Sequence, residues 1–319
     1  MTRLLAAVLT LALAAGASAQ TWPERPVHII VPAPAGSSLD VIARLVGERL
    51  RERWKQPIVV DNKSGAGGLI GMDMTAKAAP DGYTLGLGFN GPIAFGPFMY
   101  KHMAYDPVKD LQPIVLATSQ PNVLAVQASN PARNLPEFIA WAKTQGDKLS
   151  YASVGNGSSS QLTAELFDRE TGIRAVHVPY NGSPPAAGSV AGGDTQMVFA
   201  TAPALLPLAQ AGRLKLLAVT SLQRLPSMKD LPTVAEQGVP GFEALAWNGL
   251  FAPAAMPAAL AERINADVNA VLKEPEVREA LAKQGLIVGG GSAAEFKAMI
   301  AADAKKWGAL IVKAGIKLD

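Results

Sequence analysis

The sequence predicts an α/β protein built from two similar lobes, and three observations support this. Short β-branched runs alternate with stretches of helical periodicity, glycine- and serine-rich turns join most strands to the next helix, and the whole pattern restarts near residue 149. A repeated strand–turn–helix–strand order favours parallel sheets covered by helices on both faces. The expected fold class is therefore α/β, with two lobes joined by crossing strands.

The first half of this pattern begins with an apolar run at residues 27–31, which ends at a proline and a Gly/Ser turn. Apolar residues then recur at helical spacing from 41 to 54, with Arg and Glu on the opposite face. A strand at 58–60, a glycine turn at 64–68 and a strand at 83–87 complete a β-α-β-α-β unit.

The second half repeats the order with a strand at 149–153, a Gly/Ser turn at 155–160 and a helix at 161–171. Further strands are expected at 175–180, 196–200 and 214–220. Extended stretches at 114–126 and 247–253 join the halves, and the C-terminal part is helical, with a capping box at Ser292 and Glu295. We therefore expect a discontinuous first lobe (20–122 and 246–319) and a second lobe (123–245).

The N-terminal residues are typical of a signal peptide. Arg3 supplies the positive charge, an apolar run of about a dozen residues follows, and Ala17-Ser18-Ala19 is a small-residue cleavage signal. The run is shorter than the roughly 20 residues that a membrane span needs. We expect residues 1–19 to be removed, leaving a soluble, monomeric periplasmic protein that begins at Gln20 and does not insert into a membrane.

Composition and motifs argue against nucleic-acid binding and catalysis. The formal net charge is only +3, without a basic run that could follow a phosphate backbone, and there is no cysteine. The three histidines, His28, His102 and His177, lack metal-ligand spacing. A dinucleotide-like Gly86-x-Gly88-x-x-Gly91 is followed by Pro92 and Pro97, which we expect to leave no clean helix N-terminus there to receive a pyrophosphate. We therefore predict no enzyme, no cofactor and no metal.

Two glycine–serine turns carry the functional prediction. Each turn leads from a predicted strand into a predicted helix: Gly36-Ser37-Ser38 in the first half and Gly157-Ser158-Ser159-Ser160 in the second. A helix N-terminus presents unpaired N–H groups and about half a positive charge, and serine adds hydroxyl donors. If the lobes face each other, the two turns form two facing anion sites, which suit a small carboxylate with one or two carboxyl groups. Ordinary helix capping would explain either turn taken alone.

The chain resembles the solute receptors of tripartite tricarboxylate transporters, the Bordetella uptake gene (Bug) family. The resemblance spans the mature chain, with Asp40 and Arg44 after the first of these turns. The matching stretches are residues 22–27 (WPERPV), 31–36 (VPAPAG), 61–68 (DNKSGAGG), 79–84 (APDGYT), 151–158 (YASVGNGS), 177–182 (HVPYNG), 231–238 (LPTVAEQG) and 249–253 (GLFAP).

The resemblance implies a type II periplasmic binding fold and a receptor that delivers a carboxylate to a membrane permease. In the family, backbone amides of the loops matching 33–38 and 155–159 hold one carboxylate. The candidate ligand-binding residues are Ala33, Pro34, Ala35, Gly36, Ser37, Ser38, Asp40, Phe89, Asn90, Gly155, Gly157, Ser158, Ser159, Gln161, Tyr180 and Ala200. Trp247 is a further aromatic candidate for the cleft wall.

The sequence departs from the family pattern at informative positions. Pro34 and Ser37 replace small residues of the first loop, and Gln161 stands where many members have His. Ala200 ends a strand that often ends in Asp, a residue that could pair with a ligand ammonium. We therefore expect an amine-free dicarboxylate or an aromatic acid as the ligand.

Two other functions fit parts of the sequence. A receptor that presents its closed form to a sensor kinase would share the same fold and site. An exported hydrolase would use a loop serine and would need a base close to Ser37 or Ser158, which the sequence does not indicate.

Overall fold

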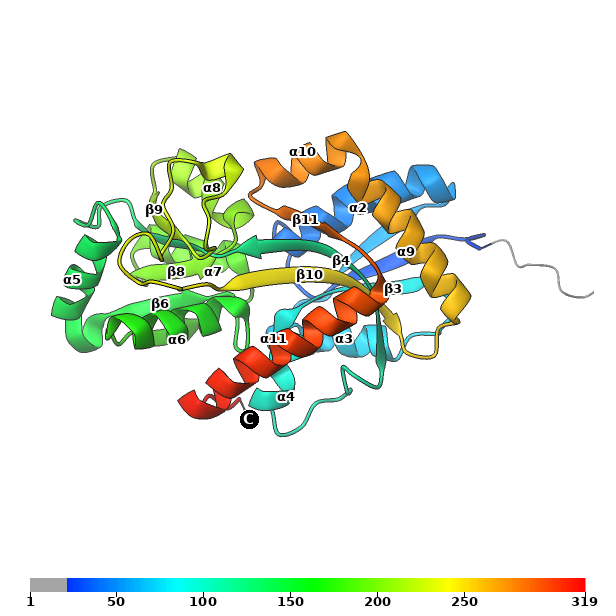
Figure 1. Cartoon of the computed structure of the whole chain (residues 1–319), viewed down its shortest axis with the longest axis horizontal. Helices are drawn as coiled ribbons and strands as arrows, with labels where there is room; N and C mark the ends of the chain where they lie inside the picture. Colours follow the sequence, from blue (N-terminus) through cyan, green and yellow to red (C-terminus); the bar gives the residue numbers. More distant parts are fainter. Residues whose placement is uncertain (1–21, 319) are drawn as a thin grey trace, which may run out of the picture.

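The computed structural model describes residues 22–318 and has the expected α/β architecture, with two lobes each built around its own sheet (Figure 1). The predicted signal peptide (1–19) and the predicted start at Gln20 lie outside the described residues. The first lobe holds a six-stranded sheet in the order β11-β4-β10-β3-β1-β2, and the second holds a five-stranded sheet in the order β7-β6-β8-β5-β9.

The strands of the first sheet are β1 (Val27–Val31), β2 (Ile58–Asn62), β3 (Thr84–Phe89), β4 (Leu111–Pro121), β10 (Leu245–Pro253) and β11 (Ile287–Gly290). The strands of the second are β5 (Val123–Gln127), β6 (Ser150–Ser153), β7 (Val176–Pro179), β8 (Met197–Ala200) and β9 (Leu214–Val219). The helices of the first lobe are α2 (Ser38–Trp54), α3 (Leu69–Ala76), α4 (Gly96–Met99), α9 (Ala258–Lys273), α10 (Pro275–Lys283) and α11 (Ala293–Ala314). Those of the second are α5 (Leu135–Gln145), α6 (Ser159–Thr171), α7 (Ser183–Gly192) and α8 (Ala202–Gln210). Short helical turns are η2 (Ala66–Gly68), η3 (Gly91–Phe95), η4 (Gly146–Lys148) and η5 (Pro226–Met228).

In the first lobe, β1 pairs in parallel with β2 and β3, so crossover helices are required. Helix α2 makes one of them and buries Ile42, Val46, Leu50 and Trp54, which recur every four residues on the face toward the sheet. The apolar residues of α2, α9 and α10 share one core with the sheet. Those of α3 and α11 belong to the core on the other face, so helices cover both faces of the sheet.

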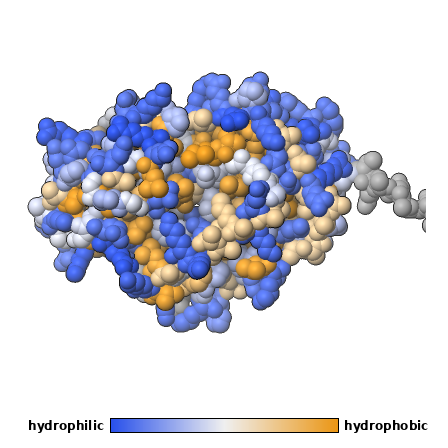
Figure 2. Space-filling view, in the orientation of Figure 1, coloured by the Kyte–Doolittle hydropathy of each residue, from blue (hydrophilic) through white to orange (hydrophobic). Residues whose placement is uncertain are grey.

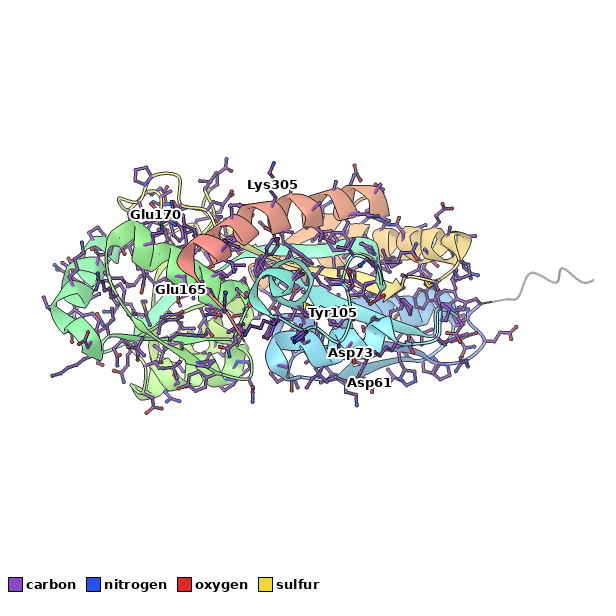
Figure 3. The ribbon with its side chains drawn as sticks, turned by 90° about the horizontal axis from the view of Figure 1, so that it is seen from below. Asp61, Asp73, Tyr105, Glu165, Glu170 and Lys305 are labelled. Carbon is purple, nitrogen blue, oxygen red and sulfur yellow. The ribbon has the colours of Figure 1, made fainter. Side chains whose placement is uncertain are left out.

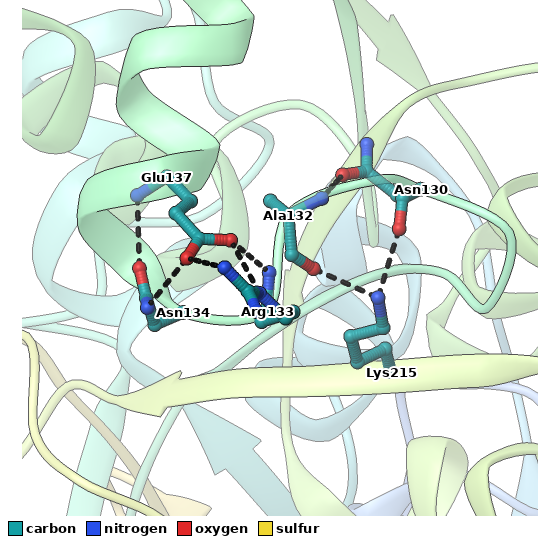
Figure 4. Close-up of polar contacts among 6 residues, drawn as sticks. All are labelled: Asn130, Ala132, Arg133, Asn134, Glu137 and Lys215. Carbon is teal, nitrogen blue, oxygen red and sulfur yellow. Dashed lines mark hydrogen bonds and ion pairs between the residues drawn. The ribbon is translucent and has the colours of Figure 1, made fainter.

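In the second lobe, β6 pairs in parallel with β7 and β8, while β5 runs antiparallel to β8 and β9. Helix α5 begins at an Asn134 cap whose side chain accepts the Glu137 N–H at 2.9 Å, and Arg133 forms an ion pair with Glu137 (Figure 4). Lys215 of β9 donates to the carbonyls of Asn130 and Ala132 and so ties the preceding loop to the sheet (Figure 4).

Two long strands connect the lobes. β4 and β10 run side by side and antiparallel from one lobe toward the other (Figure 1). Where β4 gives way to β5, the Asn122 N–H donates to Thr220 Oγ1 at 2.8 Å and the Thr220 N–H donates to the Asn122 carbonyl at 2.9 Å. The expected lobe boundaries, after residues 122 and 245, lie beside this junction, and that the chain divides there into domains stays a prediction.

Short helical segments follow β3 at the positions of Pro92 and Pro97. The five-residue turn η3 and the four-residue α4 begin there, and each proline lies in the first turn of its segment. Proline is tolerated at this position because a first-turn N–H has no partner within the helix.

Hydrophilic side chains cover most of the rim of the face in Figure 2, and hydrophobic ones gather toward its middle. Among residues 22–318, no helix has both the length and the apolar character that a membrane span requires.

Candidate ligand-binding site

A cleft of about 540 Å³ lies between the lobes, at the edge where the parallel strands of both sheets end. Strands β1 to β3 are parallel to one another, as are β6 to β8, so the loops that follow them gather at one edge of each sheet. The cleft is lined by residues 32–34, 37–39, 64–68, 89–90, 100, 120 and 122 of the first lobe, 154–156, 159, 179–183 and 201 of the second, and 246, 248, 317 and 318 of the returning chain.

The α2 loop, residues 33–40, is held in shape by its own side chains. Ser37 caps α2, with its hydroxyl accepting the Asp40 N–H at 3.3 Å. The Asp40 carboxylate reaches back to accept the Gly36 N–H at 3.0 Å and pairs with Arg44 one turn further along the helix. Burial alone would raise the pKa of Asp40, but the hydrogen bonds from Arg44 and Gly36 outweigh it and hold the pKa below its ordinary value.

The α6 loop, residues 154–161, repeats this arrangement in the second lobe. Ser158 caps α6, accepting the Gln161 N–H at 3.3 Å and donating its hydroxyl to the Gly155 carbonyl at 2.6 Å. Gln161 Oε1 accepts the Gly157 N–H at 2.8 Å, as Asp40 does for Gly36. The two loops therefore share one hydrogen-bonding plan at the start of two opposed helices.

This plan leaves the first two amides of each helix without a protein partner. Within residues 22–318, no hydrogen bond engages the N–H groups of Ser38 and Leu39 in α2 or of Ser159 and Ser160 in α6. Ser38, Leu39 and Ser159 line the cleft. Free N–H groups at a helix N-terminus form an anion site, because they carry the positive end of the helix dipole.

The lobes touch each other through glycines on either side of the cleft. A Cβ placed on Gly67 of η2 would lie 2.4 Å from the Asn156 carbonyl oxygen of the α6 loop. A Cβ on Gly182, before α7, would lie 2.4 Å from the ring of Pro34 in the α2 loop. Each loop thus packs against a glycine of the other lobe, and only glycine permits so close an approach.

The cleft wall also carries buried polar atoms without a partner. Asn90 is 0% exposed, and its Nδ2 donates to the Leu245 carbonyl at 3.3 Å, but Oδ1 has no partner among residues 22–318. The hydroxyl of Thr201, at the start of α8, is likewise buried and unpartnered within the described chain. Buried polar groups are rarely left unpaired, so these atoms are suited to a polar ligand or water.

The cleft wall has little formal charge. Its lining residues include no Asp, Glu, Arg or His, and Lys317 is the only charged side chain among them in the described chain. The amides of Gln120 and Asn248 line the base between the crossing strands, where Asn248 Nδ2 donates to Gln120 Oε1 at 3.0 Å. Such a wall suits an anion and offers no carboxylate to neutralise a ligand ammonium group.

His177 supports the α6 loop from behind. Its Nε2 lies 2.6 Å from Ser153 Oγ, which in turn contacts both the N–H and the carbonyl of Gly155 at 3.2 Å. Burial lowers the pKa of His177 to about 4, so the ring is neutral near pH 7. Ser153 is 0% exposed, so this serine–histidine pair faces no substrate and acts as a brace.

The structure places some of the predicted site residues in the cleft wall and others outside it. Those that line the cleft are Ala33, Pro34, Ser37, Ser38, Phe89, Asn90, Gly155, Ser159 and Tyr180. Those that do not are Ala35, Gly36, Asp40, Gly157, Ser158, Gln161 and Ala200. Asp40 and Gln161 face back onto their own loops, Ala35 and Gly36 are exposed outside the cleft, and Ala200 is buried within β8 at 1% exposure.

The expectation that Trp247 lines the cleft is wrong. Its ring is 3% exposed and packs edge-on against Phe296 at 5.4 Å between centroids, and its indole N–H donates to Asp303 at 2.8 Å. Alternate residues of a strand point to opposite faces, so its neighbours Ala246 and Asn248 face the cleft in its place.

Several lining residues were not predicted. The turns at 64–68 and at Gly182–Ser183 follow parallel strands, as the two predicted loops do, so the same edge rule could have found them. Polar Gln120, Asn122 and Asn248 interrupt apolar crossing strands, which was a further available signal. Tyr100, Thr201 and Lys317 carry no such signal in the sequence.

Residues 42–316 match the tripartite tricarboxylate transporter family receptor. The chain belongs to this receptor family. Protein BugT of Bordetella pertussis (strain Tohama I) is 35% identical over 323 residues, which cover 100% of this chain and 99% of BugT. The resemblance inferred from the motifs is therefore confirmed.

Solved structures of similar receptors have the same fold. R. palustris Rpa4515 with adipate has a TM-score of 0.90 and 35% identity, covering 93% of this chain and 99% of that one. The periplasmic binding protein BugD has a TM-score of 0.88 and 32% identity, covering 93% and 99%. MatC (Rpa3494) from Rhodopseudomonas palustris with bound malate has a TM-score of 0.85 and 31% identity, covering 91% and 100%. The expected fold class is confirmed by these likenesses.

Proposed function

We propose that this receptor captures a small carboxylate between its lobes, with one carboxyl group held by the first amides of α2 and α6. The observation that carries the proposal is the pair of opposed helix N-termini whose Ser38, Leu39, Ser159 and Ser160 amides have no partner among residues 22–318. Hydrogen bonds to a charged group contribute about 1.5–3 kcal/mol each. A few of these, with burial by lobe closure, reach the roughly 8 kcal/mol of a micromolar complex.

The ligand class is an organic acid without an ammonium group. Since no Asp or Glu lines the cleft, a ligand ammonium would be buried without a counter-charge. Related receptors carry adipate and malate in their solved structures, and neither acid has an amine. A dicarboxylate or an aromatic acid fits these constraints.

A thermal-shift panel followed by titration calorimetry tests the ligand class. The panel contains adipate, malate, benzoate, aspartate and glutamate at one pH and ionic strength. Ligand at about 100 times its Kd stabilises the folded state by about 2.7 kcal/mol, which is readily seen as a higher Tm. An amine-free acid should raise the Tm and give saturable heat. Strong binding of aspartate or glutamate, or no binding of any acid, would contradict the proposal.

We further propose that the chain works in the periplasm as a monomer and passes its ligand to a tripartite tricarboxylate-type permease. Its place in the receptor family and its likeness to periplasmic binding proteins support this. Mass spectrometry of the exported protein should show a chain that begins at Gln20. Ligand-dependent capture of the permease by the tagged receptor would support delivery, whereas capture of a sensor kinase alone would favour the signalling alternative.

A further inference from the structure

The C-terminal segment after α11 returns to the cleft. The Leu318 N–H donates to the Met99 carbonyl at 2.8 Å, and Leu318 forms an isolated parallel bridge with Tyr100. In Figure 3 this segment runs from the end of α11 toward the line where the two lobes meet. Lys317 and Leu318 both line the cleft, so the last described residues of the chain form part of its wall.

The segment lies beside the α6 loop of the opposite lobe. A Cβ placed on Gly157 would lie 3.4 Å from Leu318 Cδ1 and 3.8 Å from the Tyr100 ring. The Leu318 backbone is hydrogen-bonded to the first lobe, and its side chain lies next to Gly157 of the second lobe. The neighbouring Leu318 therefore holds the backbone of Lys317 between the first lobe and the α6 loop.

Lys317 is also the only formal charge that the described chain places on the cleft wall. Within residues 22–318 its ammonium has no ion-pair partner, whereas Lys77, Lys109 and Lys283 each pair with a carboxylate about one helical turn away. The first amides of α2 and α6 are neutral donors that accommodate one carboxylate. A second anionic group in the same cleft has only Lys317 as a cationic partner.

We propose that Lys317 is a specificity-determining residue that binds the second carboxylate of a dianionic ligand. The inference rests on the proposed function, because it assumes that the helix N-termini hold the first carboxylate. It explains how a cleft lined by neutral groups can prefer a dicarboxylate over a monocarboxylate of the same chain length. The preference should weaken as salt concentration rises, because the ammonium is exposed and therefore screened.

The test compares two acids of equal length, adipate and hexanoate, by titration calorimetry on four proteins. These are the wild type, Lys317→Met, Lys317→Arg and Lys305→Met, a control on the outer side of α11 (Figure 3). We expect Lys317→Met to weaken adipate about tenfold, the size of one charge-assisted hydrogen bond. The affinity of Lys317→Met for hexanoate should change less than about twofold. Lys317→Arg should keep most of the preference for adipate over hexanoate, and Lys305→Met should have the affinities of the wild type for both acids.

The outcomes separate the two proposals. If the wild type binds adipate and Lys317→Met either leaves both acids unchanged or weakens both equally, Lys317 does not select the second carboxylate and the inference is wrong. If the wild type binds neither acid and no acid of the panel raises its Tm, the proposed function fails and the inference falls with it. Circular dichroism of each variant should match the wild type, since Lys317 is exposed and makes no ion pair in the described chain.

Discussion

The α2 and α6 loops reach the same geometry with different charges. Each has a capping serine and a side chain three residues later that reaches back to a glycine amide, Asp40 to Gly36 and Gln161 to Gly157. Asp40 places a negative charge beside an anion site, and Arg44 offsets it. Gln161 is neutral and needs no counter-charge. The same pattern of hydrogen bonds therefore shapes both loops, although the charge of the side chain that reaches back differs.

The largest expected effect comes from blocking the contact between the α6 loop and the first lobe. Gly67→Ala would place a methyl group 2.4 Å from the Asn156 carbonyl, so the lobes could not close fully on a ligand. We expect carboxylate affinity to fall by about a hundredfold, equal to about 2.8 kcal/mol. Calorimetry gives the affinity, and small-angle scattering with ligand should show less compaction than in the wild type.

Gly212→Ala is the matched control for this change. Gly67 and Gly212 have nearly the same backbone angle, φ +62° and +67°, but nothing lies within 4 Å of a Cβ on Gly212. Both variants should lose similar stability from the left-handed backbone. Equal loss of affinity in the two would show that closure does not depend on the Gly67 contact.

Changing the charge of Asp40 and of Gln161 tests how the charge of each loop affects carboxylate affinity. Gln161→Glu adds a buried carboxylate beside the anion site without a nearby arginine, and should weaken carboxylate binding about tenfold at pH 8. Asp40→Asn keeps an acceptor for the Gly36 N–H and removes a negative charge, so affinity should stay the same or rise. Gln161→Ala removes the hydrogen bond without adding charge and should change affinity less than Gln161→Glu. If Gln161→Glu binds as tightly as the wild type, no anion lies near α6.

The two capping serines should differ modestly in stability. Loss of a serine cap costs about 1 kcal/mol. Ser158→Ala should cost more than Ser37→Ala, because the Ser158 hydroxyl also donates to the Gly155 carbonyl. Chemical denaturation measures the free energy of unfolding of both variants. The reverse order would mean that the α2 loop depends more on its cap than its contacts indicate.

The smallest expected effect concerns a second aspartate, the half-buried Asp168 of α6, which has no ion-pair partner within the described chain. Burial raises its pKa to about 7, while a hydrogen bond from the Ala175 N–H partly opposes this. The folded state therefore keeps this proton when the unfolded chain has lost it, so stability falls as pH rises from about 4 to 7. Asp168→Asn should remove that loss and raise the Tm at pH 8 by about 2 °C, with less effect at pH 4. An unchanged or lower Tm at pH 8 would contradict this.

The sequence predicted the fold and the two loops because both depend on local patterns. Strands and helices follow from hydrophobic spacing. The Gly-Ser-Ser turns at 36–38 and 157–159 indicate helix N-termini without any information from the rest of the fold. Which residue of a loop faces the cleft depends on side-chain direction. The loop motifs therefore predicted Asp40 and Gln161 as ligand-binding residues, although both side chains turn back onto the backbone of their own loops.

Contacts made across the fold could not be read from local pattern. Trp247 is drawn into the core by Phe296 and Asp303, about 50 residues further along the chain. Lys317 reaches the cleft because α11 directs the chain end past Met99. Both outcomes depend on long-range packing that no motif encodes.

A crystal structure with the acid that raises the Tm most tests the central claim directly. We predict one carboxylate within about 3 Å of the amide nitrogens of both helices, Ser38 or Leu39 in α2 and Ser159 or Ser160 in α6. A ligand held in the cleft only by side chains, with those four amides still unpartnered, would contradict the account.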